Sequence, residues 1–211
     1  MRARGKSLDA ISNIRMKPGS PVYVRQQEPL GLGHAVWCAR EIVGDEPFAV
    51  LLPDELMVGQ PGFMKQMVEA YNAVGGNVIG ALEVADSETD KYGIISPGAI
   101  DGRLTAVKAL VEKPKQGSAP SNLMIPGRYI LQPDVMRILE TQEKGAGGEI
   151  QLTDAMAQLI GQQPFHGFTF DGQRYDCGDK AGYIQANLAI AIARDDIGPG
   201  VRAFAEGLLG R

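Results

Sequence analysis

Cysteine and histidine are scarce in this sequence, with two of each in 211 residues. Cys38 and Cys177 are too few for a disulfide framework, and together with His34 and His166 they form no cluster at the spacing of a zinc site. The sequence therefore indicates neither a disulfide-stapled fold nor a zinc module. We expect both cysteines to be reduced, with Cys38 in the core.

Long hydrophobic runs and blocks of one charge are also missing. No apolar run approaches the roughly 20 residues that a bilayer span needs, and the opening MRARGKSLDAISNI has no apolar stretch after its basic start. The net charge is −4, and no long run of one sign gives the electrostatic footprint of a nucleic-acid-binding protein. We expect no nucleic acid and no membrane as partner, and a cytoplasmic location.

The composition that is present suits a globular chain. Hydrophobic residues make up 44% of the sequence, which is enough for the core of one domain. We expect that domain over residues 1–195 and a helical tail over 196–211. In the tail, Phe204 and Leu208 are spaced i, i+4. Docking of this stripe on the chain's own domain is favoured over a partner, and a homo-oligomer is left open.

Apolar runs and helical periodicities alternate along the chain, which predicts an α/β domain with a largely parallel sheet. The first half is expected to hold strands at 21–26, 48–53 and 77–84, and helices at 33–42 and 62–73. Short extended pieces follow in YGIIS, RLTAVKALVEKP and GRYILQ, then helices at 133–141 and 149–161, a hairpin signal in FTFDGQRYD and a helix over 180–193.

The stretch VRQQEPLGLGHA, residues 24–35, places a glycine-rich turn between an expected strand and an expected helix. Backbone N–H groups in such a turn can face a ligand, and Gly31 and Gly33 permit close approach. Gln26 carries an amide donor and an amide acceptor, which suit the edge of a heterocyclic base. On spacing alone, a plain strand-to-helix connection remains the favoured interpretation.

Two aspartates follow expected strands. Asp54, in LLPDELM, lies at the carboxyl end of a buried strand, where a carboxylate can hold Mg²⁺ and where open α/β sheets bind ligands. A turn or capping role suits it equally well, and Glu55 is expected to be solvated. In RYDCGDKAGY, Asp176 could join Asp54 on a metal. Asp179 is explained by helix capping, whereas Lys180 could neutralise phosphate near a helix start.

The VEKP stretch places Glu112 beside Lys113 at a strand end. Their side chains point to opposite faces if the strand is regular, so both could meet one ligand only if the strand bends. Pro114 makes such an ending plausible. Without further context, two exposed charges at a turn are favoured.

Taken together, these stretches resemble one family, the bacterial UTP–glucose-1-phosphate uridylyltransferases, or UDP-glucose pyrophosphorylases, within the sugar nucleotidyltransferases. The resemblance runs from about Gly5 to about Tyr183. It rests on six motifs in the family's order: YVRQQEPLGLGHAVWCAR, FAVLLPDELM, KYGIISP, VEKPKQGSAPSNLMIPGRYIL, GAGGEIQLTDA and RYDCGDKAGY. Six long motifs in order are far more specific than any one of them, and they outweigh the structural interpretations of the single motifs.

The resemblance implies roles for the nucleotide and metal positions. Gln26 would read uracil, with the backbone at Gly31 completing base recognition. Asp54 would bind Mg²⁺ as a catalytic residue, and Asp176 matches the second acidic position that related enzymes place on the metal. The implied cofactor is therefore Mg²⁺.

For the sugar phosphate, the resemblance implies that Gly93 lies against the hexose and that Glu112 accepts hydrogen bonds from its hydroxyls. Lys113 would act as a catalytic residue that offsets charge on the sugar phosphate, and Lys180 would reach the phosphates. Glu149, in GGEIQLTDA, is left open between a structural and a functional role.

The implied reaction is Mg²⁺-dependent uridylyl transfer from UTP to α-D-glucose 1-phosphate, giving UDP-glucose and pyrophosphate. The implied fold is a Rossmann-like, GT-A-like nucleotidyltransferase domain with a mixed, mostly parallel central sheet flanked by helices. Two alternatives stay open: a glucose-1-phosphate thymidylyltransferase, and a non-catalytic module that binds UDP-sugars.

One departure from the family pattern concerns the start of the chain. The family begins with a strand that leads into a glycine-rich loop, followed by basic residues, which cradles the triphosphate. The start of this sequence resembles a region well inside the family chain instead. We therefore expect a truncated form, with the first strand and loop absent, that has little activity and that is poorly soluble or associates.

Overall fold

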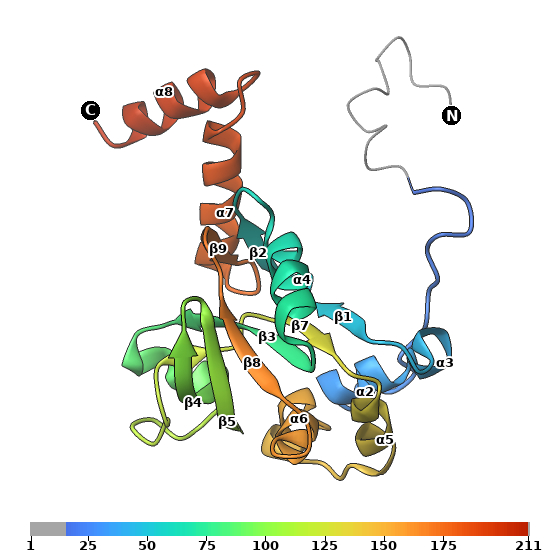
Figure 1. Cartoon of the computed structure of the whole chain (residues 1–211). Coiled ribbons are helices and arrows are strands. Elements are labelled where there is room, and N and C mark those ends of the chain that lie inside the picture. Colours follow the sequence, from blue (N-terminus) through green and yellow to red (C-terminus); the bar gives the residue numbers. More distant parts are fainter. Residues whose placement is uncertain (1–15, 211) are drawn as a thin grey trace.

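The computed structural model of the chain describes residues 16–210 (Figure 1). The beginning of the family-like stretch, near Gly5, lies outside the described residues. Within the described part, no helix has the length and apolar character that crossing a bilayer requires. Residues 16–31 lead into the domain without a helix or a strand.

A seven-stranded sheet forms the centre of the domain, with strand order β1-β7-β3-β6-β4-β5-β8. β3 also pairs with β8, so the last strand returns to the middle of the sheet. The strands are β1 (Phe48–Leu51), β3 (Asn77–Glu83), β4 (Gly93–Asp101), β5 (Leu104–Glu112), β6 (Leu123–Met124), β7 (Arg128–Leu131) and β8 (Phe165–Thr169).

The α/β class and the mixed sheet are confirmed, but the prediction of a mostly parallel sheet is wrong for the described residues. The β3–β8 pair is parallel, and the other pairings in this sheet are antiparallel. The long pair β4–β5 explains part of the difference. Because only Gly102 and Arg103 separate these strands, the chain returns directly and needs no crossover helix.

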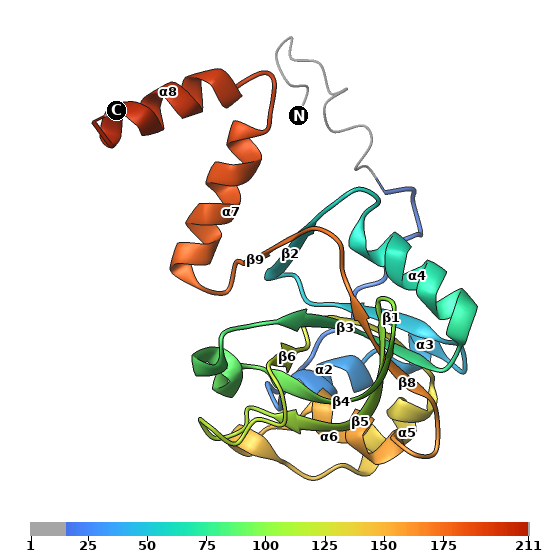
Figure 2. The ribbon, with the colours of Figure 1, turned by 60° about the vertical axis from the view of Figure 1, so that its left-hand side comes forward.

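Helices cover both faces of the sheet. α2 (Leu32–Trp37), α5 (Asp134–Thr141) and α6 (Leu152–Leu159) contact one another on one face, where α6 packs on β5. α4 (Phe63–Val74) packs on β3 and β7 from the other side (Figure 2). The remaining short helices are α3 (Arg40–Val43) and the 3₁₀ helices η1 (Asp86–Lys91) and η2 (Ala146–Gly148).

Each helix-bearing face has its own apolar cluster. The larger cluster surrounds α2, α5 and α6 and includes Ile79, Leu131, Leu152 and Met156. The smaller lies under α4 and includes Met67. The sheet is thus held between two packed layers, which fixes the positions of its strand ends.

Three local predictions are wrong. Residues 21–26 form no strand, because no described strand pairs with them, and Tyr23 is 90% exposed. The helix expected over 33–42 is broken after Trp37, where α2 ends. The expected hairpin around Phe170 is absent, since β8 joins the central sheet. The next strand, β9 (Gln173–Asp176), pairs instead with an unpredicted strand, β2 (Glu55–Val58).

The C-terminal helices α7 (Lys180–Ile192) and α8 (Gly198–Leu208) form an arm that projects from the domain in both views (Figures 1 and 2). α8 contacts α7, and the expected docking of its stripe on the domain is wrong: Phe204 is 69% exposed and Leu208 72%. The reason is geometric, because α7 carries α8 away from the sheet.

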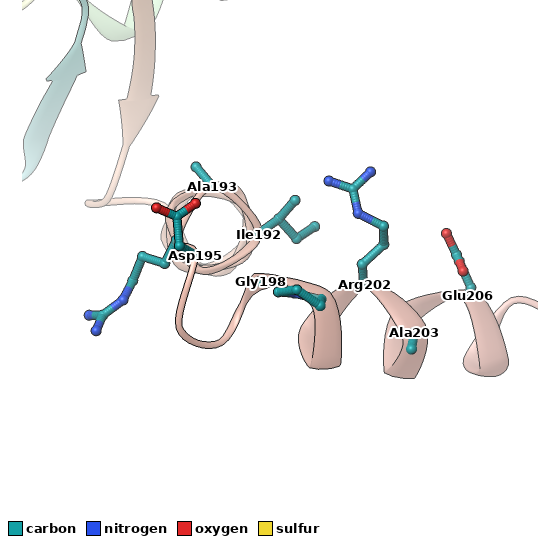
Figure 3. A pocket seen from close by; sticks show the side chains of 9 residues that line it. Ile192, Ala193, Asp195, Gly198, Arg202, Ala203 and Glu206 are labelled. Carbon is teal, nitrogen blue, oxygen red and sulfur yellow. The ribbon is translucent and has the colours of Figure 1, made fainter.

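A pocket of about 450 Å³ lies where α7 turns into α8. Figure 3 shows Ile192 at the end of α7 and Arg202 of α8, which both line the pocket, with Glu206 further along α8. No side chain that the sequence analysis singled out lines this pocket.

Candidate active site

A cleft of about 300 Å³ opens near the ends of β1, β4, β5 and β9. Its walls include six of the candidate site residues: Asp54, Gly93, Glu112, Lys113, Glu149 and Asp176. Gln26, Gly31 and Lys180 are not in these walls. The structure thus brings together the metal and sugar candidates, whereas the candidates for the base and for a further phosphate contact lie outside the cleft.

The loop that presents Asp54 is held by a buried arginine. Arg128 Nη1 donates a hydrogen bond to the carbonyl of Leu52 at 2.8 Å, and Nη2 donates to the carbonyl of Glu55. Burial lowers the pKa of Arg128, and the carboxylates of Glu55 and Asp54 partly offset this effect. Because Arg128 bonds the backbone on both sides of Asp54, the exposed Asp54 carboxylate stands on a fixed turn.

Glu55 was expected to be solvated, and this prediction is wrong. The side chain is buried and accepts two hydrogen bonds from Arg174, at 2.6 and 2.7 Å. Burial by itself would lower the pKa of Arg174, but hydrogen bonds to Glu55 and Tyr92 outweigh it and raise that pKa. The reason is the β2–β9 pairing, whose register places Glu55 opposite Asp176, two residues beyond the arginine.

Asp176 is fixed by four hydrogen bonds. Its Oδ2 accepts from the hydroxyl of Tyr92 and from Arg174 Nη2, both at 3.1 Å. Its Oδ1 accepts from the backbone N–H groups of Gly178 at 3.0 Å and Asp179 at 3.2 Å. An ionised carboxylate offers about four acceptor positions. A metal ion bound directly by Asp176 would therefore replace or share one of these bonds.

The two aspartates nevertheless share one small space. An oxygen of Asp54 and an oxygen of Asp176 each lie 3.2 Å from the position that a Cβ on Gly178 would occupy. Among residues 16–210, no group of three or more His, Cys, Asp or Glu side chains could hold a metal. Mg²⁺ commonly needs only one or two protein carboxylates plus substrate phosphates. The donor set therefore fits such an ion, with Asp54 as the carboxylate free to bind.

The β4–β5 pair contributes another part of the wall. Gly93 is paired with Glu112, and a Cβ on Gly93 would lie 3.0 Å from Glu112 Oε2 and 3.1 Å from Thr153 Oγ1. A larger residue at position 93 would therefore crowd both polar groups. The absence of a side chain leaves them open to the cleft.

Lys113 ends the strand in an unusual conformation. Its φ is +43°, in the left-handed region that non-glycine residues rarely adopt. The backbone N–H of Lys113 donates to the carbonyl of Tyr92 at 3.0 Å. Because the strand is not regular at this point, Glu112 and Lys113 line the same cleft, which meets the condition set in the sequence analysis.

The glycine-rich turn packs against another part of the chain. The N–H of Gly33 donates to the carbonyl of Ile150 at 2.8 Å, and the N–H of Ile150 donates to the carbonyl of Leu30 at 2.7 Å. A Cβ on Gly31 would lie 2.7 Å from the carbonyl oxygen of Ile150. The turn therefore needs glycine for chain packing. Glu149 belongs to this contact and also lines the cleft.

Lys180 is the first residue of α7 and is exposed. It lines a separate surface pocket with Cys177 and Tyr183. Asp179 caps the helix as expected, since its side chain accepts from the N–H of Gly182 at 2.9 Å. Lys180 is thus close to Asp176 in sequence but not in the wall of the cleft.

The sequence analysis missed several residues of the site. Lys91 and Tyr129 line the cleft, Arg174 and Tyr92 donate hydrogen bonds to the Asp176 carboxylate, and Arg128 donates to backbone carbonyls beside Asp54. One signal was available: Arg174 lies two residues before Asp176 on a strand, so the two side chains share a face. The buried position of Arg128 had no local signal.

The mixed α/β sheet and the strand-end cleft with its carboxylates and lysine agree with what comparison with known proteins shows. The chain belongs to the nucleotidyl transferase family, whose family model it matches over residues 8–192.

Two curated relatives are UTP–glucose-1-phosphate uridylyltransferases. The chain is 47% identical over 189 residues to that of Bacillus subtilis (strain 168), covering 90% of this chain and 65% of the relative. It is 48% identical over 179 residues to that of Komagataeibacter xylinus, covering 85% of this chain and 63% of the relative. The resemblance found in the sequence is thereby confirmed. The chain spans less than two thirds of the length of these relatives.

A solved structure of UDP-glucose pyrophosphorylase complexed with UDP-glucose has a TM-score of 0.80 with this chain and 40% sequence identity. The likeness covers 82% of this chain and 66% of that one. The nucleotidyltransferase fold expected from the sequence is confirmed.

Proposed function

We propose that the protein transfers a uridylyl group from UTP to α-D-glucose 1-phosphate, forming UDP-glucose and pyrophosphate. The names of relatives at 47% and 48% identity support this substrate pair. The observation that carries the proposal is the meeting of Asp54 and Asp176 with Glu112 and Lys113 in one cleft. These are the groups that a sugar phosphate and a metal-bound nucleotide would need.

In the proposed reaction, a phosphate oxygen of glucose 1-phosphate attacks the α-phosphorus of UTP. The bond from that phosphorus to the oxygen bridging to the β-phosphate breaks, and pyrophosphate leaves with the electron pair. No protein nucleophile is required, because positioning and charge neutralisation carry phosphoryl chemistry. Lys113 offsets the charge of the sugar phosphate, while Glu112 accepts hydrogen bonds from hexose hydroxyls above Gly93.

The carboxylates in the cleft walls would repel the phosphates of a nucleotide unless a cation offsets their charge. Members of the family generally use a divalent metal ion, and we propose Mg²⁺, held by Asp54 with Asp176 beside it. When bound, the ion would offset the negative charge of the phosphates. Arg128 keeps the Asp54 turn in place, and Arg174 keeps the Asp176 carboxylate oriented.

The nucleotide contacts are proposals that rest on the sequence motifs. Gln26 and the backbone at Gly31 would read the uracil base. Lys180 would contact phosphate, which requires the triphosphate to reach the start of α7. Glu149 has a structural contact under Gly31 and a place in the cleft wall, so both roles proposed for it remain compatible with its position.

The first experiment measures pyrophosphate release by the 211-residue chain with UTP, glucose 1-phosphate and Mg²⁺. Asp54→Asn keeps the shape of the side chain but removes its charge, and it should lower the rate by about 10²-fold or more. Turnover that persists unchanged in Asp54→Asn would refute the role of this carboxylate. Replacing UTP by dTTP tests the alternative of a thymidylyltransferase.

A second measurement tests the alternative of a non-catalytic UDP-sugar-binding module. UDP-glucose binding is followed by calorimetry, with Glu112→Gln as the variant that weakens a sugar contact. Binding without turnover would favour the binding module, and neither binding nor turnover in a folded preparation would refute both. The retention of Asp54 and Asp176 in the cleft favours the enzyme, since a sugar-nucleotide binder has little use for metal carboxylates.

A homo-oligomer stays a prediction. The arm formed by α7 and α8 supports it, because Ile184, Phe204 and Leu208 are all more than half exposed. Sedimentation of the chain tests it, with Phe204→Ser as the variant expected to weaken association.

A further inference from the structure

Both amide hydrogens of Gln26 are used inside the protein. Its Nε2 lies 3.0 Å from the carbonyl oxygen of Gly31 and 3.0 Å from Nδ1 of His34. A carbonyl oxygen can only accept a hydrogen bond, so the contact with Gly31 requires the nitrogen of the amide on this side. The orientation of the Gln26 amide therefore does not depend on an assumption about the histidine.

This orientation determines the state of His34. Because Gln26 Nε2 can only donate, Nδ1 of His34 must accept and carries no proton. The ring proton of neutral His34 then lies on Nε2, which faces the Sγ of Cys38 at 3.9 Å. The ring stacks on Trp37, with centroids 5.9 Å apart, and the guanidinium of Arg40 lies 3.7 Å from the Trp37 ring centroid. The acceptor is thus held in place by its neighbours.

The same orientation leaves Gln26 with one free function. Within residues 16–210, its Oε1 makes no hydrogen bond, and it is not among the buried polar atoms without a partner. Gln26 therefore offers a ligand an acceptor and no donor. This differs from the sequence analysis, in which the side chain was expected to offer both.

We propose that His34 is a positioning residue that, together with the Gly31 carbonyl, orients Gln26 so that it accepts a hydrogen bond only from a base that carries an N–H at its pairing edge. This inference rests on the proposed function, in which Gln26 reads the base. Uracil presents N3–H and is accepted. Cytosine presents a lone pair at N3, which would face the lone pairs of Oε1, so it is rejected.

His34 and Gly31 act together on one amide group. If the acceptor at position 34 is removed, the Gly31 carbonyl alone opposes rotation of the amide. A rotated amide presents Nε2, which is a donor suited to N3 of cytosine. Loss of His34 should therefore weaken the preference for uracil over cytosine rather than weaken the binding of both nucleotides equally.

The test compares the dissociation constants of UDP-glucose and CDP-glucose. The wild-type chain is expected to prefer UDP-glucose, and His34→Ala should lower that preference by about fivefold, the effect of one neutral hydrogen bond. His34→Asn should restore it, because its Oδ1 can occupy the place of Nδ1. Cys38→Ser changes the neighbour of the other ring nitrogen and should leave the preference unchanged.

Two results would overturn the inference while leaving the proposed function intact. One is a wild-type preference for UDP-glucose that His34→Ala does not alter. The other is an equal loss of affinity for both nucleotides, which would indicate a merely structural role. Binding of neither nucleotide by the wild-type chain would instead refute the proposed function and the base-reading role together.

A second readout needs no nucleotide. Two-bond ¹H–¹⁵N spectra report which ring nitrogen of a histidine carries the proton, and this chain has only two histidines. His34→Ala identifies its signals by their loss. An unprotonated Nδ1 in the free protein supports the inference, and a proton on Nδ1 of the neutral ring overturns it.

Discussion

Replacing Arg174 by methionine should lower the free energy of unfolding by about 3–5 kcal/mol, because it leaves the Glu55 carboxylate buried without its partner. The Arg174 side chain is 17% exposed and that of Glu55 is 10% exposed. Two hydrogen bonds join them, at 2.6 and 2.7 Å. Each bond to a charged group contributes about 1.5–3 kcal/mol, so the pair of bonds agrees with the expected total.

The assay is urea unfolding of a double-mutant cycle made from Arg174→Met and Glu55→Leu. The double variant leaves no unpaired buried charge, so it should cost at least about 2 kcal/mol less than the two single changes added together. Arg194→Met is the matched control. Its ion pair with Asp196 is 57% and 61% exposed, so losing it should cost far less than losing the buried pair.

A coupling energy within about 0.5 kcal/mol of zero, which is typical of an exposed pair, would show that the Glu55–Arg174 pair is not buried in solution and would refute the expected cost. A cost for Arg174→Met no larger than that for Arg194→Met would lead to the same conclusion. Either result would mean that water reaches the Glu55 carboxylate, and the rigid orientation of Asp176 would lose its support.

Three further predictions concern stability. Burial raises the pKa of the Tyr129 hydroxyl above its ordinary value of 10.0. The folded state therefore keeps its full stability with respect to this group below pH 10, and loses stability as pH rises further because the unfolded chain releases the proton more readily. Tyr129→Phe should therefore remove a loss of about 1.4 kcal/mol per pH unit, read from urea unfolding above pH 10, and equal slopes in both proteins would contradict this. Gly31→Ala should lower the free energy of unfolding by about 2 kcal/mol more than Gly117→Ala does, because both glycines have positive φ but only Gly31 has a carbonyl 2.7 Å from the added Cβ. Calorimetric melting of the two variants measures this difference, and equal shifts in melting temperature would argue against the clash. Asp54→Asn should change the free energy of unfolding by less than about 0.5 kcal/mol, whereas Asp176→Asn should cost about 1–3 kcal/mol because the new amide cannot accept from the donors at Oδ2. Similar costs for the two variants would contradict the hydrogen-bond assignment.

The local elements could largely be predicted from the sequence because their signals are local. The apolar spacing of Met64, Met67 and Tyr71, with a glycine stop, predicted α4 close to its observed bounds, Phe63–Val74. The strand expected at 77–84 is observed as Asn77–Glu83. Prediction was wrong where an element depends on a partner: an extended sequence at 21–26 forms no strand when no described strand pairs with it.

In the candidate site, too, the residues with local signals could be predicted and the contacts between distant segments could not. Asp54, Glu112 and Asp176 were found because they follow strand-like runs, which is a property of neighbouring residues. Gln26 was also found, but which of its amide atoms faces outward depends on the Gly31 carbonyl and on His34 in the first turn of α2. No spacing rule could supply that orientation.

The sequence by itself determined the family, the order of the motifs and the chemical groups available to the site, because these depend on residue identity. Only the tertiary structure decided how these groups are presented. Arg174 contacts Glu55 across 119 positions of the chain, through the pairing of β9 with β2, whereas the local signal in FTFDGQRYD indicated a hairpin instead. Lys113 shares a cleft with Glu112 only because its backbone leaves the extended region at φ +43°. Contacts so distant in sequence form only when the whole sheet is assembled, since pairing partners and register are set by the packing of all its strands.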